Sequence, residues 1–463
     1  MSKKSLVQKL KIENYLNKIS FNNFGVGSML SYEIMRIFLF NRRPENIKFS
    51  LSEKISIFLY KNGFRINFFN QPDFNFNNNI LLLVSNFHPK IFGYFKTFSS
   101  FKKWKFKFFH FDKNKKELGF YYKLRLNLND YISWKKKYKT ISNELLNRLE
   151  ILKSKNLISF KESNFLFQMF IIKSQNVIYI ESLIKKSKPI ALITDFDRLS
   201  INSLLIQALN KHSIPTFTFI HGSTIPNIDN FVPFFAKYVF CWSDYQARQF
   251  KSMNDNLLVV GNNKFSRDKV NRLDSTFLKR NNLKNSVNIV TLVTNISNDN
   301  YLKHALTFID AVSGTNWIPV IKIHQNEKLK DYEKLIKSDS KIILIKDEFT
   351  LDEIIGVSDF VLTQQSTVSV EAIIKGVSFA VFNPLKHRDL GICSLLLEHS
   401  NTKIFTNSID LNLFLKNTDR NNIEKFIDKN SQNDFVKKFI SKYLEKDSSN
   451  MINQKLNIIL NEN

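Results

Sequence analysis

The sequence has few of the residues on which small secreted proteins and metal-binding modules depend. Cys241 and Cys393 are the only cysteines among 463 residues, so a disulfide framework is impossible, and no Cys/His cluster has zinc-ligand spacing. Glycine is scarce, at 11 residues. No apolar run approaches the ~18 residues that a membrane span needs. Residues 1–18 alternate charged with single apolar positions and contain no signal-peptide core. We therefore expect a cytoplasmic protein.

The composition is that of a globular chain long enough for two domains. Of 463 residues, 43% are hydrophobic and 24% are charged, which argues against a disordered protein. The net charge of +27 accompanies a surplus of Lys, Asn, Ile and Phe that is spread over the whole chain rather than gathered in one patch. Such a charge still favours anionic partners, namely nucleic acid, an acidic membrane surface or an anionic substrate.

Residues 1–77 carry the weakest pattern. Segments 10–19, 29–40 and 50–60 have helical spacing, and aromatic and basic residues are interleaved in this region. We expect this part of the chain to pack on the main fold, although an interfacial helix at a membrane would share the pattern.

From residue 80 onward, short apolar runs alternate with segments of helical spacing, as is typical of parallel α/β sheets. Residues 131–188 are predicted to be helical throughout, and the chain after Asn407 is mostly helical. Shorter helices are expected at 90–103, 200–212, 300–312, 327–337, 350–356 and 367–375. The expected strands are 80–84, 105–111, 190–194, 216–220, 238–242 and 257–260 in a first series, and 288–293, 317–323, 341–345, 360–362 and 379–382 in a second.

This alternation predicts an α/β protein with two Rossmann-like domains facing across a cleft, a helical N-terminal segment and a helical C-terminal tail. A polar, charged stretch between the two series is the candidate linker. The predicted boundaries are 1–77 for the N-terminal segment, 78–270 for the first domain, 271–286 for the linker, 287–420 for the second domain and 421–463 for the C-terminal helices.

The second domain contains a strand, a polar turn and a helix within residues 359–384. The helix is expected to open at Ser366 or Thr367 and to close at Gly376. A strand that feeds a helix N-terminus favours an anion, because free backbone N–H groups and the helix dipole point at the incoming charge. The two hydroxyls either cap the helix or contact a phosphate, and Glu371 either accepts from a ribose hydroxyl or is a surface residue.

Ligands of open α/β sheets lie outside the carboxyl ends of the strands. In the second domain, Asn295 follows one strand, and Lys322, His324 and Gln325 stand at the end of the next. A basic residue with a histidine suits a nucleotide base or phosphate through charge-assisted hydrogen bonds. An ordinary amphipathic strand end, with Glu327 placed favourably in the first turn of a helix, is the alternative.

In the first domain the candidates are Asp195, Asp197, His221 and Gly222. The imidazole of His221 stands just past a buried strand, where it is placed to act as a general base or a phosphate donor, and Gly222 allows close approach of a phosphate. Asp195 and Asp197 are placed to deprotonate an acceptor hydroxyl. Capping of a turn by His221, capping of a loop by the aspartates and pairing of Asp197 with Arg198 are the competing interpretations.

The order of these motifs resembles GT-B glycosyltransferases, in particular those that make bacterial capsule and surface polysaccharides. The resemblance spans roughly residues 78–410. Relatives of this kind include sialyl- and polysialyltransferases, capsule Kdo transferases and teichoic-acid glycerophosphate polymerases. The matching residues are Asp195, Ile214-Pro215-Thr216-Phe217, His221-Gly222, Phe240-Cys241-Trp242-Ser243 and Val259-Val260-Gly261-Asn262 in the first domain, and Lys322-Ile323-His324, Ser358-Asp359, Ser366-Thr367, Glu371-Ala372 and Gly376 in the second.

The resemblance implies an acceptor domain followed by a domain that binds a nucleotide sugar. It implies that His324 contacts the base or ribose, that Ser366 and Thr367 bind the phosphate, and that Asp195, Asp197 or His221 is the base. Gln325 stands where these families usually have proline, so the resemblance does not fix the identity of the donor nucleotide. CMP- or UDP-linked donors are expected. No cofactor or metal is implied, although the Asp-x-Asp spacing of Asp195 and Asp197 leaves a divalent ion as a minority alternative.

We therefore expect a glycosyltransferase acting on a cell-surface polysaccharide or a lipid-linked glycan, peripherally associated with the inner face of the cell membrane. A nucleotide-sugar 2-epimerase is the alternative within the same architecture. Two alternatives from another class are a non-catalytic glycan-binding protein and a basic nucleic-acid-binding protein. The sequence argues against the last one, since it has no helix-turn-helix, zinc or RNA-binding aromatic signature.

Overall fold

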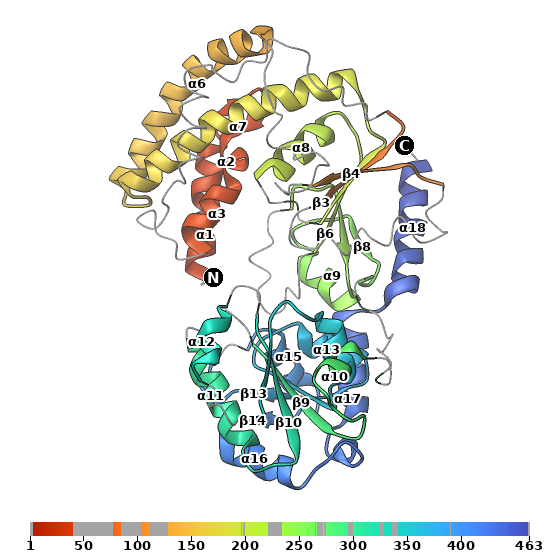
Figure 1. Ribbon diagram of the computed structural model, residues 1–463. Helices are drawn as coiled ribbons and strands as arrows, with labels where there is room; N and C mark the ends of the chain where they lie inside the picture. The colour runs from red at the N-terminus through yellow and green to blue at the C-terminus, as the bar shows by residue number, and fades with distance from the viewer. Residues whose placement is uncertain are drawn as a thin grey trace.

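The structure is a computed structural model that describes residues 3–39, 77–84, 103–110, 128–195, 197, 200–220, 234–263, 265, 272, 275–294, 300–324, 327–335, 341–388 and 390–461. The described residues form two α/β domains, each built on a parallel sheet of six strands, and a helical layer beside the first domain (Figure 1). The prediction of two Rossmann-like domains is confirmed. The predicted helical segment 50–60 and residues 90–102 of the predicted helix 90–103 lie outside the described residues.

The N-terminal sheet has the strand order β4-β3-β5-β6-β7-β8, and all its neighbours pair in parallel. Both faces of a parallel sheet are covered, which explains why its strands are continuous apolar runs. The strand order reverses between β3 and β5. The bounds are β3 (Ile80–Val84), β4 (Phe106–His110), β5 (Ala191–Thr194), β6 (Thr216–Phe219), β7 (Tyr238–Cys241) and β8 (Leu257–Val259).

Successive side chains of a strand point to opposite faces, and β5 shows which helices cover each face. Leu192 packs in a cluster with α7 (Phe160–Lys186) and α8 (Ser200–Lys211). Its neighbours Ala191 and Ile193 pack on Ile452 and other residues of the last helix, α18 (Glu445–Asn461). Helix α9 (Asp244–Phe250) follows β7. The C-terminal helix therefore completes the core of the N-terminal domain.

The helical layer joins the start of the chain to the two long helices α6 (Leu128–Ser154) and α7. Buried Ile12, Leu16 and Phe21 share one core cluster with residues of α6, α7 and α8, as expected for an N-terminal part that packs on the main fold. Its remaining elements are α1 (Lys3–Leu16), β1 (Ser20–Phe21), β2 (Phe24–Gly25), α2 (Val26–Met29) and α3 (Ser31–Leu39).

The C-terminal sheet has the strand order β11-β10-β9-β12-β13-β14, all parallel, which is the doubly wound order 3-2-1-4-5-6 of a Rossmann domain. Its order reverses between β9 and β12. The bounds are β9 (Asn288–Val293), β10 (Trp317–Lys322), β11 (Ile343–Ile345), β12 (Phe360–Thr363), β13 (Ser378–Phe382) and β14 (Ile404–Phe405).

Helices cover both faces of this sheet. Val290 and Leu292 of β9 pack in a cluster with α11 (Tyr301–Val312) and α16 (Ser408–Lys416), whereas Ile289 faces α10 (Thr276–Arg280) and α13 (Leu351–Val357). Helix α10 lies within the range expected as linker, yet Phe277 and Leu278 are buried in the core of this domain. The other helices are α12 (Leu329–Glu333), α14 (Val368–Ile374), α15 (Ile392–His399), the 3-10 turn η5 (Ile423–Lys425) and α17 (Lys429–Phe435).

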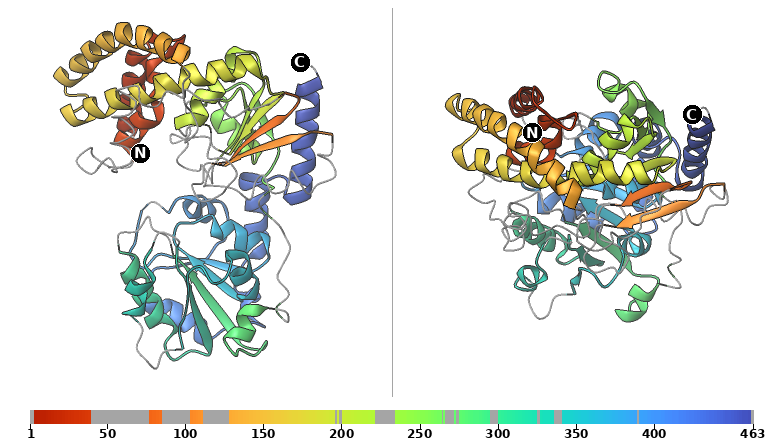
Figure 2. Two further views of the ribbon diagram at one scale, coloured as in Figure 1. Left: turned by 45° about the horizontal axis from the view of Figure 1, so that its top comes forward. Right: turned by 90° about the horizontal axis from the view of Figure 1, so that it is seen from above.

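The chain returns to the N-terminal domain through α17, the π-helical turn η6 (Val436–Ile440) and residues 441–444. Figure 2 shows α18 running along the side of the N-terminal sheet that lies away from α6 and α7. Backbone hydrogen bonds join the returning segment to the first domain. The amide of Asn262 donates to Tyr443 O at 3.1 Å, and the amide of Lys442 donates to Trp242 O at 3.1 Å. Trp242 also shares a core cluster with Phe439, so the two domains are packed together at this joint.

Candidate functional site

The polar side chains predicted for the donor side stand at the carboxyl ends of three adjacent strands. β9 lies between β10 and β12, so Thr294, just after β9, is flanked by His324 on one side and by the turn after Thr363 on the other. Adjacent strands lie about 4.8 Å apart. This rim surrounds the point where the strand order reverses, which is where doubly wound sheets bind ligands.

The backbone of His324 is held by hydrogen bonds to two neighbouring side chains. Its amide N–H donates to Thr294 Oγ1 at 2.9 Å and, more weakly, to Glu327 Oε2 at 3.4 Å. Burial lowers the pKa of the imidazole below its usual range, and the nearby Glu327 carboxylate opposes that shift. A neutral imidazole has one donor and one acceptor nitrogen, which suits a hydroxyl or a nucleobase edge.

Glu327 is the centre of a buried hydrogen-bond network beneath His324. Its Oε2 accepts from Thr294 Oγ1 at 2.6 Å and from Tyr332 OH at 2.6 Å, and the carboxylate is only 3% exposed. Burial, followed by the bond to Glu327, raises the pKa of Tyr332. The predicted alternative for Glu327, a favourable position near a helix start, does not describe these contacts, which lead to other elements.

Lys322 turns toward the neighbouring strand β11. Its Nζ donates to Lys346 O, while Lys346 Nζ donates to Glu327 O at 2.8 Å. Burial lowers the pKa of Lys322, and the carboxylates of Asp347 and Glu348 oppose this shift. The ammonium of Lys322 thus lies at the β10–β11 side of the rim and carries positive charge close to it.

The turn after β12 presents two hydroxyl side chains. Helix α14 begins at Val368, and Ser366 Oγ accepts from the Val368 amide at 3.2 Å, so Ser366 supplies a local cap. Thr367 is the residue that precedes the helix, and its side chain makes no capping hydrogen bond. Glu371 lies one turn into α14 and is only 8% exposed, which excludes the alternative of a surface residue.

The rim continues to β13 through residues outside the predicted site. Gln364 Nε2 donates to Asn383 Oδ1 at 2.8 Å, and Asn383 Nδ2 donates to His387 O at 3.0 Å. Gly391 has a positive φ of 55°, and a Cβ there would lie 3.2 Å from Gln365 Cγ. Asn383 directly follows the predicted strand 379–382, so the strand-end rule would have found it.

In the N-terminal domain, both aspartates follow β5 and are buried. Asp195 is fully buried, and Asp197 is 3% exposed. Asp197 Oδ2 accepts from the amides of Phe235 at 2.7 Å and Ala236 at 3.3 Å, which fixes the segment leading into β7. One oxygen of Asp197 therefore caps the loop, as the alternative interpretation of this residue predicts.

Four predicted site residues lie outside the described part of the chain, namely His221, Gly222, Asn295 and Gln325. Among the described residues, no three His, Cys, Asp or Glu side chains gather as metal ligands.

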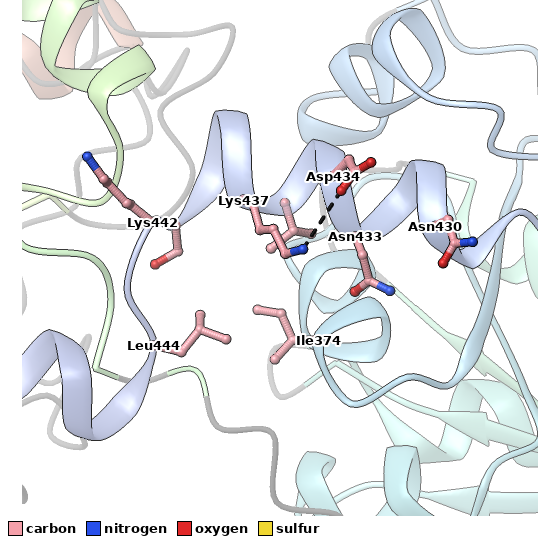
Figure 3. A pocket seen from close by; sticks show the side chains of 9 residues that line it. Ile374, Asn430, Asn433, Asp434, Lys437, Lys442 and Leu444 are labelled. Atoms are coloured by element: carbon pink, nitrogen blue, oxygen red, sulfur yellow. Dashed lines mark ion pairs between the residues drawn. The ribbon is translucent and has the colours of Figure 1, made fainter.

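A polar pocket of about 560 Å³ lies beside the returning segment, away from the strand ends (Figure 3). Lys437 and Asp434 form an exposed ion pair across 3.8 Å at its wall, whereas Lys442 reaches Asp244 of the N-terminal domain at 3.2 Å. The pocket contains none of the predicted site residues, and we assign it no ligand.

No protein-family model matches the sequence, and neither does any curated protein sequence. Solved structures of similar architecture include S. aureus MnaA with UDP, at 15% identity and a TM-score of 0.49, covering 82% of this chain and 97% of that one. The Neisseria meningitidis UDP-GlcNAc 2-epimerase bound to UDP-GlcNAc has 11% identity and a TM-score of 0.48, covering 82% and 100%. The wall teichoic acid polymerase TagF has 11% identity and a TM-score of 0.49, covering 94% and 97%.

Similarities this low carry no functional argument. The strand orders of the two sheets establish two Rossmann-like domains in one chain. None of the helices among the described residues is both long and apolar enough to cross a bilayer.

Proposed function

We propose that this protein is a glycosyltransferase that moves a sugar from a nucleotide-activated donor to a surface polysaccharide or a lipid-linked glycan. The observation that carries the proposal is the polar rim at the point where the order of the C-terminal sheet reverses, where Thr294, His324 and the turn with Ser366 follow three adjacent strands. The resemblance of the motif order to capsule-type enzymes supports the choice of acceptor.

In this proposal the C-terminal domain binds the nucleotide. His324 contacts the base or ribose, Ser366 and Thr367 contact the phosphate, and Glu371 accepts from a ribose hydroxyl. Lys322 adds positive charge near the leaving phosphate. Preorganised donors of this kind stabilise the charge that develops on the leaving nucleotide. The proposal includes no cofactor or metal, and it takes the donor to be a CMP- or UDP-linked sugar.

The N-terminal domain supplies the base that removes the proton from the acceptor hydroxyl. Asp195, Asp197 and His221 are the candidates. Asp197 also accepts two backbone N–H groups, and substitution of each candidate in turn tests which one is the base. Gly222 and Asn295 are proposed to line the same site.

Association with the inner face of the cell membrane is part of the proposal. Helix α6 exposes Lys135, Lys136 and Lys139, together with Ile132, whose exposed fraction is 58%. Exposed lysines beside apolar side chains suit an anionic lipid surface. Cosedimentation with vesicles of anionic and of neutral lipid tests this point, and equal recovery with both would contradict it.

The assignment of the donor side is tested by thermal shift with CMP, CDP, UDP and GDP. At least one nucleotide is expected to raise the melting temperature of the protein, since a ligand that binds only the folded state stabilises it. A shift with none of the four would contradict the proposal. Incubation with the identified nucleotide sugar in the absence of acceptor then separates the two enzyme classes: a 2-epimerase converts the free nucleotide sugar, and a glycosyltransferase requires the acceptor.

A further inference from the structure

Glu327 has a contact pattern that the proposed binding roles do not use. Its carboxylate is buried, and three donors converge on one oxygen, Oε2: Thr294 Oγ1 at 2.6 Å, Tyr332 OH at 2.6 Å and the His324 amide at 3.4 Å. The second oxygen, Oε1, is buried without a hydrogen-bond partner among the described residues. A buried carboxylate is costly unless its hydrogen bonds offset the lost hydration.

The donors show which segments the carboxylate joins. Thr294 follows β9, His324 follows β10, and Tyr332 is a fully buried residue of α12. The Thr294 hydroxyl both donates to Glu327 and accepts from the His324 amide at 2.9 Å. Glu327 thereby ties two strand ends and one helix into a single wall.

Local capping does not explain this arrangement. Helix α12 begins at Leu329 after Lys328, and its N-terminal cap has no side-chain hydrogen bond. The amide of Glu327 donates to His324 O at 2.9 Å, which closes a tight turn directly after the histidine. The side chain therefore links the Thr294 hydroxyl to Tyr332 of α12 instead of capping the start of that helix.

We infer that Glu327 is a positioning residue of the nucleotide site, which holds the backbone of His324 against Thr294 so that the imidazole meets the nucleotide in one fixed orientation. The inference rests on the proposed function, because it takes His324 to be a nucleotide contact. Glu327 itself acts through His324 and touches no substrate.

An electrostatic consequence gives a second, independent measurement. The Glu327 carboxylate raises the pKa of His324 against the effect of burial. Glu327→Gln keeps the size of the side chain and removes its charge, so the pKa of His324 should fall further. This titration reports the electrostatic contact between the two side chains, and the binding measurement below reports the positioning.

The experiment compares Glu327→Gln, His324→Ala and the double variant with the parent protein, using isothermal titration with the nucleotide that gives the largest thermal shift. Glu327→Gln is expected to weaken nucleotide binding about tenfold, as loss of a charged hydrogen-bond partner does. In the His324→Ala background the same change should cost little further, because residues that act as a unit are not additive. Glu333→Gln, which changes an exposed glutamate of α12, is the matched control and should bind as the parent does.

Unchanged affinity in Glu327→Gln, or an equal loss in both backgrounds, would overturn the inference. If Glu327→Gln does not fold, Tyr332→Phe removes one donor from the same oxygen and should give a smaller loss with the same dependence on His324. If the parent protein binds no nucleotide, the proposed function and this inference fail together, whereas unchanged affinity of Glu327→Gln in a parent that binds overturns the inference alone. A His324 pKa equal in the parent and Glu327→Gln would overturn it.

Discussion

A side chain on Gly261 would collide with the backbone of Tyr443, because an added Cβ would lie 2.2 Å from its carbonyl oxygen. Gly261 also has a positive φ of 78°, which other residues adopt only with strain. The contact joins the end of the N-terminal sheet to the segment that returns from the C-terminal domain. The two domains therefore meet backbone to backbone at this point, without an intervening side chain.

Gly261→Ala should destabilise the joint by about 3 kcal/mol, the combined effect of a positive φ and a steric clash with main-chain atoms. Gly314→Ala is the control, since its φ is 66° but nothing lies within 4 Å of an added Cβ. Its cost should be about 1 kcal/mol. Hydrogen exchange of residues 441–461 reports the difference, and equal protection in the two variants would show that the contact is dispensable.

The buried ion pair between Lys173 and Glu33 should be sensitive to the loss of one partner. Lys173 is fully buried on α7, and its Nζ contacts Glu33 Oε2 and donates to Met29 O at 2.5 Å. Glu33→Gln leaves an uncompensated buried ammonium, and the cost should be about 3–5 kcal/mol. Replacing both residues by Met should recover much of this loss.

Hydrogen exchange of α3 and α7, followed as the temperature is raised, measures the loss of stability in Glu33→Gln. The control is Glu150→Gln, which removes the exposed ion pair with Lys153 on α6. Exposed pairs contribute about 1 kcal/mol or less. A double variant as unstable as Glu33→Gln alone would mean that the cost comes from lost packing and not from the unpaired charge.

The C-terminal domain should lose stability in mild acid because of His304. Burial lowers the pKa of His304 to about 4, although the bond between Nε2 and Phe382 O at 3.1 Å opposes the shift. The unfolded chain binds a proton near pH 6.5 and the folded domain only near pH 4, so the free energy of unfolding falls by about 3 kcal/mol as the pH drops between these values.

His304→Gln removes this titration while keeping a donor near Phe382 O. Urea unfolding of the C-terminal domain at pH 7 and pH 4.5, with hydrogen exchange as the domain-specific probe, should show a smaller acid loss in the variant than in the parent. Equal losses would assign the acid sensitivity to other groups.

Substitution of His324 and of His221 should affect nucleotide binding and turnover separately. His324→Ala should weaken nucleotide binding, because it removes a proposed contact with the base or ribose. His221→Ala should leave nucleotide affinity intact and lower turnover by about 10²–10⁴-fold, the usual contribution of a general base. Titration calorimetry and a product assay on both variants check this, and normal nucleotide affinity in His324→Ala would remove that residue from the site.

Most of the fold could be predicted because parallel strands covered on both faces are continuous apolar runs. The stretch 288–293 was predicted as a strand and is β9. Strand β14 was not predicted, since it has two residues and Ile404 is 40% exposed, so no apolar run marks it. The predicted tail is helical, but only the structure shows that Ile452 of α18 faces the N-terminal sheet.

The candidate site could be predicted only as positions along the chain. That Thr294 and His324 lie side by side follows from the strand-end rule once β9 and β10 are neighbours. The network around Glu327 depends on Thr294, which is distant in sequence, and the cap made by Asp197 depends on Phe235. Tertiary packing creates these contacts, and no local spacing encodes them.

The return of α18 has a consequence for biosynthesis. Ile452 and Leu456 cover one face of the N-terminal sheet, yet they are translated after the entire C-terminal domain. That face stays uncovered until these residues emerge from the ribosome, which adds about 5–20 residues per second. The N-terminal domain is thus the first to begin folding and the last to finish, and in the interval its apolar face is open to chaperones and to aggregation.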